Sequence, residues 1–241
     1  PLRGYVMRSG PDHPGYDGAA PRPASSAVAG TLGPVALALY DNPVSSNALK
    51  VRFLLAELGL AYERIEVPMA RPRPAGYVAL NPLGGIPTLC DGDLVLTESA
   101  AILRYLVARE GAWHLYPREP VRRARVDELL DRFTLTLRPA LARVEMEAFG
   151  WTPGEGFGGR DPDPAAARRV GEEIRPTLAV FDGLLSSPYA LGEPTLADFA
   201  AAPALFRTTL TGLDLAPHPR LWAWRDALMA RPSFAAAGPV R

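Results

Sequence analysis

Residues 35–59 read VALALYDNPVSSNALKVRFLLAELG and carry in succession the patterns of a strand, a turn and a helix. The first six residues form a short apolar run typical of a buried strand, and the DNP triplet breaks it. From Ser45 onward the apolar residues recur at helical spacing, and Gly59 ends that pattern as glycine commonly does. The stretch therefore predicts a strand–helix unit with two hydroxyl side chains where the helix begins.

The next fifty residues extend this unit into an α/β domain. Residues 62–67 alternate in polarity and predict a second strand, and the proline-broken stretch 68–82 predicts an irregular link. Apolar segments at 86–90 and 94–96 flank an Asp-Gly-Asp turn, which predicts a hairpin. A helix is expected over 98–110. The order of these elements predicts a mixed sheet of four strands.

After about residue 118 the sequence has helical periodicity throughout. Thr195 and Asp198 form a capping-box variant at one helix start. Pro139, Pro176 and Pro203 lie inside the apolar patterns, so we expect kinks or breaks there. The predicted helices cover residues 121–149, 164–185, 195–210 and 219–230.

These patterns divide the chain into three parts. Residues 1–34 contain six glycines and six prolines without a helical or strand period, so we expect a flexible tail over 1–33. An α/β domain follows over 34–112. An all-helical domain is expected over 118–241.

Composition excludes several classes of protein. The 26 Lys and Arg residues balance 26 Asp and Glu residues, so no net charge favours nucleic acid or an anionic membrane surface. A single cysteine excludes an internal disulfide bond and a cysteine-based zinc site, and the three histidines lack ligand spacing. No apolar run approaches the ~20 residues of a membrane span. We therefore expect a metal-free globular protein with neither nucleic acid nor a membrane as a partner.

Four motifs in a fixed order carry a family resemblance. They are LYDNPVSSN (39–47), NPLGGIPTL (81–89), DGDLVLTESAAILRYL (91–106) and GEPTLADF (192–199). Together they resemble the cytosolic glutathione transferases, in particular the serine-type phi, zeta and nu-like classes. The resemblance implies a thioredoxin-like domain followed by a helical bundle. It also implies glutathione as co-substrate, a homodimer, a cytoplasmic location and a role in detoxification.

The start of the first helix offers candidates for activating the glutathione thiol. An ordinary thiol, with a pKa near ~8.5, is mostly protonated at neutral pH, and the thiolate is the nucleophile. The resemblance implies that Ser45 donates a hydrogen bond to that thiolate, with Ser46 and Asn47 as competing candidates. Because all three residue types are favoured at helix N-caps, a purely structural role stays open. Tyr40 lies inside the first strand and is interpreted as a core residue.

Two further motifs are expected to bind glutathione. The family carries a cis proline at Pro87, which would turn the backbone of Ile86 towards the cysteinyl part of the ligand. Ser99 is expected to bind the γ-glutamyl carboxylate at a helix start, and Glu98 its ammonium group. A capped helix with an acidic first turn and no ligand is the alternative interpretation.

One position departs from the family pattern. Gly85 stands where many relatives carry Gln or Lys, so a contact to the glycine end of glutathione is missing. Lys50 and Arg73 are the basic candidates to replace it.

The electrophile is expected between the two domains, against Val44, Phe149 and Trp151. The lone Cys90 lies in a predicted core strand and is not expected to be a nucleophile. The sequence thus predicts a glutathione transferase that conjugates the glutathione thiolate to a hydrophobic electrophile. Two alternatives remain: a glutathione-dependent disulfide reductase or isomerase using the same site, and a binding protein of this fold without catalytic activity.

Overall fold

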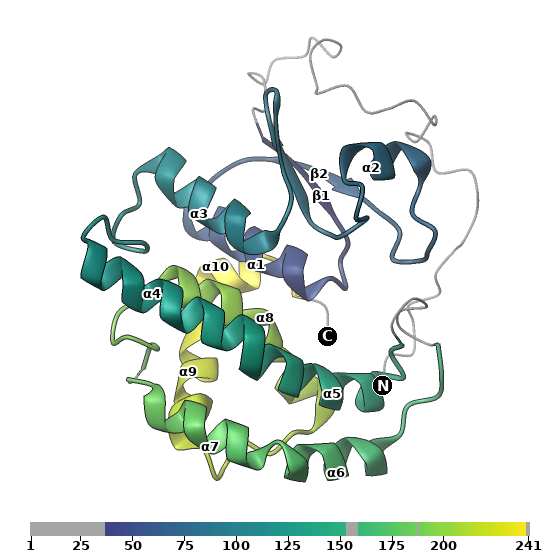
Figure 1. Ribbon diagram of the computed structural model, residues 1–241, viewed down its shortest axis with the longest axis vertical. Coiled ribbons are helices and arrows are strands. Elements are labelled where there is room, and N and C mark those ends of the chain that lie inside the picture. The colour runs from purple at the N-terminus through teal and green to yellow at the C-terminus, as the bar shows by residue number, and fades with distance from the viewer. Residues whose placement is uncertain (1–36, 153–158, 187, 240–241) are drawn as a thin grey trace.

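The first part of the chain is a mixed four-stranded sheet with helices on both faces, as Figure 1 shows. The computed structural model describes residues 37–152, 159–186 and 188–239, so the predicted flexible tail over 1–33 lies outside the described residues. The elements of this part are β1 (Leu37–Asp41), α1 (Ser46–Glu57), β2 (Glu63–Glu66), α2 (Ala75–Leu80), β3 (Thr88–Asp91), β4 (Leu94–Leu96) and α3 (Ser99–Glu110).

The strand order is β2-β1-β3-β4, with β1 and β2 parallel and β3 antiparallel to both of its neighbours. The predicted mixed sheet is therefore confirmed. The stretch predicted as an irregular link contains the short helix α2, so that part of the prediction was wrong. Pro74 stands immediately before α2, and the six residues of the helix include no proline. Proline is tolerated at such a helix start.

Alternation along β1 directs its side chains to opposite faces of the sheet. Leu37 and Leu39 belong to the main hydrophobic cluster, which includes residues of α1 and α3. Tyr40 and Cys90 point to the other face and join a smaller cluster with Tyr77 of α2. The rings of Tyr40 and Tyr77 lie 5.8 Å apart, so the interpretation of Tyr40 as a packed core residue is confirmed.

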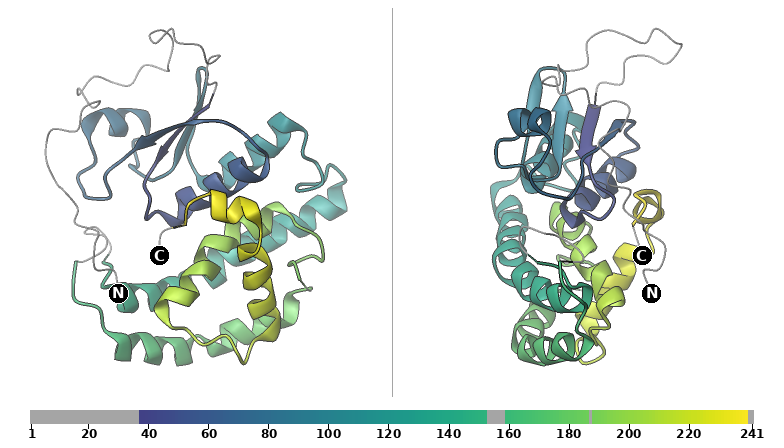
Figure 2. Two further views of the ribbon diagram at one scale, coloured as in Figure 1. Left: turned by 180° about the vertical axis from the view of Figure 1, so that it is seen from behind. Right: turned by 90° about the vertical axis from the view of Figure 1, so that its right-hand side faces the viewer.

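The second part of the chain is helical. Within the described residues, no helix combines the length and the apolar character that crossing a membrane requires. Figure 2 shows α10, at the end of the chain, returning to α1 of the first part. The elements are α4 (Pro120–Arg132), the π-helical turn η1 (Phe133–Leu137), α5 (Arg138–Phe149), α6 (Pro164–Glu173), α7 (Arg175–Leu184), α8 (Leu196–Thr211), α9 (Pro219–Met229) and α10 (Pro232–Ala236).

The three prolines inside the predicted helices have different effects. Just before Pro139 the chain forms a π-helical turn, in which the Arg138 N–H donates to the Phe133 carbonyl. Because proline has no N–H, the α-helical ladder cannot continue unchanged through this point. A helix break next to Pro176 separates α6 from α7, as predicted. At Pro203 no break occurs, because α8 is buried along most of its length and its packing outweighs one lost hydrogen bond.

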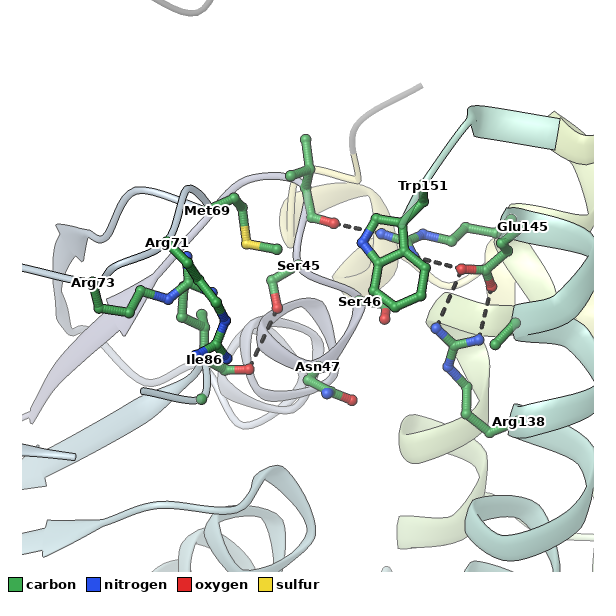
Figure 3. Close-up of a pocket in the computed structure, with 14 residues that line it drawn as sticks. Ser45, Ser46, Asn47, Met69, Arg71, Arg73, Ile86, Arg138, Glu145 and Trp151 are labelled. Carbon is green, nitrogen blue, oxygen red and sulfur yellow. Dashed lines mark hydrogen bonds and ion pairs between the residues drawn. The ribbon is translucent and has the colours of Figure 1, made fainter. Parts of the chain in front are cut away.

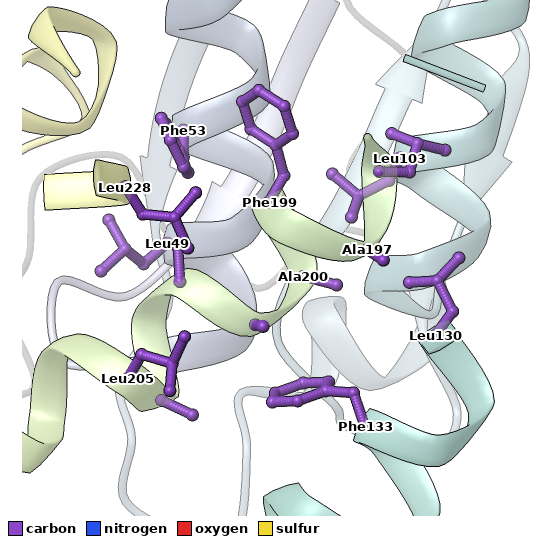
Figure 4. Close-up of a cluster of buried hydrophobic side chains, with 14 of the residues drawn as sticks. Leu49, Phe53, Leu103, Leu130, Phe133, Ala197, Phe199, Ala200, Leu205 and Leu228 are labelled. Atoms are coloured by element: carbon purple, nitrogen blue, oxygen red, sulfur yellow. The ribbon is translucent and has the colours of Figure 1, made fainter. Parts of the chain in front are cut away.

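One hydrophobic core joins the two parts of the chain (Figure 4). Phe53 of α1 packs against Phe199 of α8, with ring centroids 4.4 Å apart. It also meets Phe234 of α10 edge-on at 5.2 Å. Because the two parts share this core, the domain boundaries 34–112 and 118–241 stay predictions.

Polar contacts supplement this core at the end of α1. Arg231 and Ser233 both donate hydrogen bonds to the Glu57 carboxylate, one of them over 3.2 Å. Burial alone would raise the pKa of the Glu57 carboxyl. The hydrogen bonds from Arg231 and Ser233 and the Arg231 charge outweigh it, so the pKa lies below its usual value.

Replacing Glu57 with glutamine is expected to lower the free energy of unfolding at pH 7 by about 1–2 kcal/mol. A carboxyl whose pKa is depressed in the folded state stabilises the protein above its unfolded pKa of about 4.3, and that contribution is lost as the pH falls. In urea denaturation, the difference in the free energy of unfolding between wild type and Glu57→Gln should therefore be smaller at about pH 3 than at pH 7. Glu193→Gln is the control, because its contact with Arg122 is exposed and 3.8 Å long. Equal stability of Glu57→Gln and wild type at pH 7 would contradict this role.

Candidate active site

A cavity of about 450 Å³ lies between the two parts of the chain, and Figure 3 shows its lining. It brings together most of the residues singled out in the sequence: Val44, Ser45, Ser46, Asn47, Ile86 and Trp151. Of the other predicted site residues, Pro87, Glu98, Ser99 and Phe149 are not among the described residues that line it. The rest of the described lining is Met69, Arg71, Arg73, Gly85, Arg138, Ala142, Glu145 and Arg207.

Ser45 is the N-cap residue of α1, with extended backbone angles, and the residue is 8% exposed. Its Oγ accepts a hydrogen bond of 3.2 Å from the Ala48 N–H, so Ser45 caps the helix; a role in activating a thiol stays a prediction. Capping uses a lone pair of the oxygen and leaves the hydroxyl proton available. That proton faces the Ile86 carbonyl at an Oγ–O distance of 3.5 Å, the outer limit of a hydrogen bond. A closer or more basic acceptor in the cavity can therefore take it.

The first turn of α1 adds positive electrostatic character to this side of the cavity. The N–H groups at the start of a helix have no partners within the helix, and the helix dipole favours a negative charge there. Ser46 is 8% exposed, whereas Asn47 is exposed, and both line the cavity. An anionic sulfur beside Ser45 would lie close to this helix start.

The turn that carries Ser45 is held from both parts of the chain. The Asn42 side chain donates to the Val67 carbonyl over 2.8 Å and accepts from the Val44 N–H over 3.1 Å. From the helical part, Arg207 of α8 donates to the Val44 carbonyl. These contacts fix the position of the Ser45 hydroxyl relative to both walls of the cavity.

The segment around Ile86 forms the neighbouring edge of the cavity. The Ile86–Pro87 peptide bond is cis, as the family resemblance implies. The side chains of Tyr77 and Asn81 both donate to the Gly85 carbonyl, the latter over 2.9 Å. The segment that carries Ile86 is therefore anchored to α2 and the residue that follows it.

The start of α3 lies apart from the described lining of this cavity. Glu98 is exposed and has φ +66°, a left-handed conformation that is uncommon for a residue other than glycine. Such backbone outliers often occur at binding sites. Ser99, the first residue of α3, is half-buried. The predicted binding of the γ-glutamyl group by Glu98 and Ser99 stays a prediction. The alternative, a capped helix with an acidic first turn, was wrong: the N-cap residue Glu98 makes no side-chain capping hydrogen bond, and the first turn of α3 has no acidic residue.

The sequence analysis did not identify a charged cluster on the side of the cavity formed by α5 and α8. Arg138 of α5 forms two hydrogen bonds of 3.1 and 3.2 Å with Glu145, and Arg207 binds the same carboxylate over 2.7 Å. Positions 138 and 145 are two helical turns apart, so helical periodicity alone could have placed them on one face. Arg207 comes from 62 residues further along the chain, and no local pattern indicates its position.

Lys50, one of the two basic candidates for the glycine end of glutathione, is buried and lies outside the described lining. Burial first, and then the charge of Arg138, lower the pKa of Lys50 to about 8. The other candidate, Arg73, does line the cavity, next to Arg71. Burial, followed by the charge of Arg71, lowers the pKa of the Arg73 guanidinium.

Comparison with known proteins agrees with the fold. Residues 35–108 match the N-terminal domain of glutathione S-transferases, and residues 164–227 match their C-terminal domain. The chain belongs to the glutathione S-transferase family. The predicted resemblance and the predicted fold, a thioredoxin-like domain followed by a helical domain, are both confirmed.

Relatives within the glutathione S-transferase family match over most of their length. Glutathione S-transferase GstB of Escherichia coli is 32% identical over 82% of this chain and 95% of its own. Glutathione S-transferase 3 of Zea mays is 33% identical, covering 82% of this chain and 91% of its own. A solved theta-class enzyme from Xanthomonas axonopodis pv. citri, with glutathione bound, is 30% identical, with a TM-score of 0.68 over 86% of this chain and 98% of its own.

Proposed function

We propose that this member of the family conjugates the thiolate of glutathione to an electrophile, and that Ser45 stabilises the thiolate. One observation carries the proposal. At the start of α1 the Ser45 hydroxyl faces a cavity between the two parts of the chain, while its described acceptor, the Ile86 carbonyl, is 3.5 Å away. The hydroxyl proton is therefore available to a sulfur atom placed in the cavity.

The Ser45 hydroxyl and the dipole of α1 can supply the free energy needed to lower the pKa of the glutathione thiol. Lowering the thiol pKa by about two units needs about 2.7 kcal/mol of preferential stabilisation of the thiolate. A hydrogen bond to a charged acceptor contributes about 1.5–3 kcal/mol. The dipole at the start of α1 adds about 0.3–1 kcal/mol. The thiol proton leaves to solvent, the sulfur attacks the electrophilic carbon, and the leaving group departs with its electron pair.

The surrounding residues suggest how glutathione lies. We assign its cysteinyl backbone to the N–H and C=O of Ile86, in the manner of an added strand. Its γ-glutamyl end goes to Ser99 and Glu98 at the start of α3. Its glycine carboxylate goes to Arg71 and Arg73, which line the cavity beside Ile86 and supply the cation that Gly85 does not.

Glutathione affinity and product formation test the proposal together. We expect the full-length protein to be retained on a glutathione resin. We also expect it to accelerate the formation of an S-aryl glutathione from 1-chloro-2,4-dinitrobenzene or 4-chloro-3-nitrobenzoate. Retention without any product would favour the non-catalytic alternative. Turnover of a mixed glutathione disulfide or of a maleyl double bond, with no aryl product, would favour the reductase or isomerase alternative.

Other parts of the sequence-based hypothesis also stay predictions. They are the homodimer, the cytoplasmic location and the hydrophobic nature of the electrophile. In the described lining, Val44 and Trp151 occupy the expected place, between the two parts of the chain. Phe149 is half-buried and lies outside that lining, because it is the last residue of α5 and the chain turns at Gly150.

A further inference from the structure

Two adjacent glycines precede Ile86 at the edge of the cavity, and their surroundings differ. Gly84 is buried, has φ +62°, and a Cβ atom added to it would lie 3.1 Å from Cγ of Arg73. Its backbone conformation and its neighbour therefore both favour glycine. Gly85 is exposed and its φ is not in the left-handed region. Among the described residues, a Cβ atom at Gly85 would meet only the side-chain nitrogen of Asn81, at 3.8 Å.

The space beside Gly85 is part of the cavity, because Gly85 lines it next to Ile86. The Gly85 carbonyl accepts hydrogen bonds from the side chains of Tyr77 and Asn81. These bonds fix the backbone, so the chain cannot easily shift to fill the space. Since neither backbone strain nor crowding requires glycine at position 85, the glycine leaves room for something other than a protein side chain.

The two arginines on this side of the cavity have different contacts. Arg73 donates to three backbone carbonyls, those of Gly84 over 3.1 Å, Ala70 over 3.1 Å and Pro68. Arg73 therefore holds the segment before β3 together. Arg71 is exposed and forms no hydrogen bond or ion pair with a described residue. Its guanidinium can bind a carboxylate that enters the cavity.

The position proposed for glutathione brings its third residue to this place. Its sulfur is assigned to Ser45, its cysteinyl backbone to Ile86 and its γ-glutamyl end to the start of α3. The remaining end of the peptide then runs past Ile86 in the other direction, towards Gly85 and Arg71. Figure 3 shows Arg71 and Ile86 on the same side of Ser45. The third residue of the thiol peptide therefore lies against the open space.

We propose that Gly85 determines which thiols the enzyme accepts, and that these include γ-glutamyl-cysteinyl peptides whose third residue is larger than glycine. The third side chain occupies the space beside Gly85, and Arg71 binds the terminal carboxylate of the peptide. Arg71 suits this role because its long, exposed side chain can follow a carboxylate that a larger residue displaces. The inference rests on the proposed function, because it assumes that the cysteinyl group lies at Ile86.

The test compares glutathione with γ-glutamyl-cysteinyl-glutamine, which has the same charge and a larger third residue. For each thiol, kcat/KM with 1-chloro-2,4-dinitrobenzene is divided by the rate constant of the uncatalysed reaction. The readout is the ratio of the glutamine peptide to glutathione. We expect a wild-type ratio within about three-fold of one, because the added side chain enters open space. In Gly85→Gln the ratio should fall by about ten-fold or more, and in Gly85→Ala by less.

The matched control is Gly183→Gln. Gly183 lies in α7, is exposed, and a Cβ atom added to it would have no described atom within 4 Å. It is not part of the described cavity lining, so the ratio should stay at the wild-type value.

The role of Arg71 has a separate readout, the preference for glutathione over its glycine ethyl ester. Wild type should prefer the free acid by about three-fold, the size expected of an exposed ion pair. In Arg71→Gln this preference should fall towards one. An unchanged preference would exclude Arg71 as the residue that binds the carboxylate.

The outcomes separate this inference from the proposed function. Absence of product with both thiols would reject the proposed function. Turnover of glutathione with a wild-type ratio below about 0.1 would reject the wider class of thiols and leave the proposed function in place. A ratio near one that Gly85→Gln leaves unchanged would show that the third residue lies elsewhere, and would overturn the role of Gly85.

Discussion

Replacing Ser45 with alanine is expected to lower kcat/KM for conjugation by ten-fold or more and to raise the pKa of the enzyme-bound thiol. The variant removes the hydroxyl that faces the cavity but leaves the start of α1 and the Ile86 edge in place. The pH profile of kcat/KM and the ultraviolet absorbance of the thiolate report the two effects. A profile displaced to higher pH would link the loss of rate to the thiol itself.

Ser45 also caps α1. Loss of the cap is therefore a second explanation for reduced activity in Ser45→Ala, and it must be separated from loss of the hydrogen bond to the thiolate. Loss of an N-cap side chain costs about 1 kcal/mol on replacement by alanine and only a few tenths on replacement by glycine. Ser45→Gly should therefore be close to wild type in stability and as impaired in conjugation as Ser45→Ala. Ser46→Ala is the second control and should retain activity. Unchanged activity and thiol pKa in Ser45→Ala would exclude Ser45, and a loss confined to Ser46→Ala would identify Ser46 as the donor.

The site was predictable where its geometry is local. Ser45 follows a buried strand and precedes an apolar helical pattern, and those two features place its side chain at the helix start. The cis bond at Pro87 followed from the family motif. The mixed sheet followed from the order and lengths of apolar segments, because a parallel pair needs a crossover and a short turn makes a hairpin.

What escaped prediction depends on contacts between distant segments. The sequence shows Arg207 as one position in an apolar helix, yet its guanidinium reaches Val44, 163 residues earlier in the chain. The charge of the cavity depends on which faces of α5 and α8 turn towards the first part. The π-helical turn before Arg138 helps to set that orientation, and Pro139 indicated an interruption there but not its form.

Asp198 makes both contacts that the sequence predicted and contacts that it did not. Its capping box with Thr195 was predicted from the sequence and is present in the structure. Its carboxylate is fully buried and also accepts hydrogen bonds from the Ala190 N–H over 3.1 Å and from the Trp224 indole over 2.6 Å. These partners were not predictable, because they come from a loop and from α9. One side chain thus joins three segments of the helical part.

Replacing Asp198 with alanine is therefore expected to lower the free energy of unfolding by about 4 kcal/mol or more. The change leaves four buried donors without a described acceptor: the Thr195 N–H (2.7 Å) and hydroxyl (2.9 Å), the Ala190 N–H and the Trp224 indole. Each unsatisfied buried group costs about 1–3 kcal/mol before relaxation. Urea denaturation at pH 7 measures the loss, and proteins of this size are stable by only about 5–15 kcal/mol.

If Asp198→Ala does not accumulate in folded form, Asp198→Asn gives the measurable value. It keeps one acceptor oxygen but presents an amide to donors, so a smaller loss, still of about 2 kcal/mol or more, is expected. Asp214→Ala is the matched control: that carboxylate also accepts from a backbone N–H, Ala216 at 2.8 Å, but is exposed. It should lose no more than about 1 kcal/mol. A loss of that size in Asp198→Ala as well would show that the buried carboxylate does not hold α8 in place. Because α8 carries Arg207 and Phe199, the conjugation activity of Asp198→Asn should fall in parallel with its folded fraction.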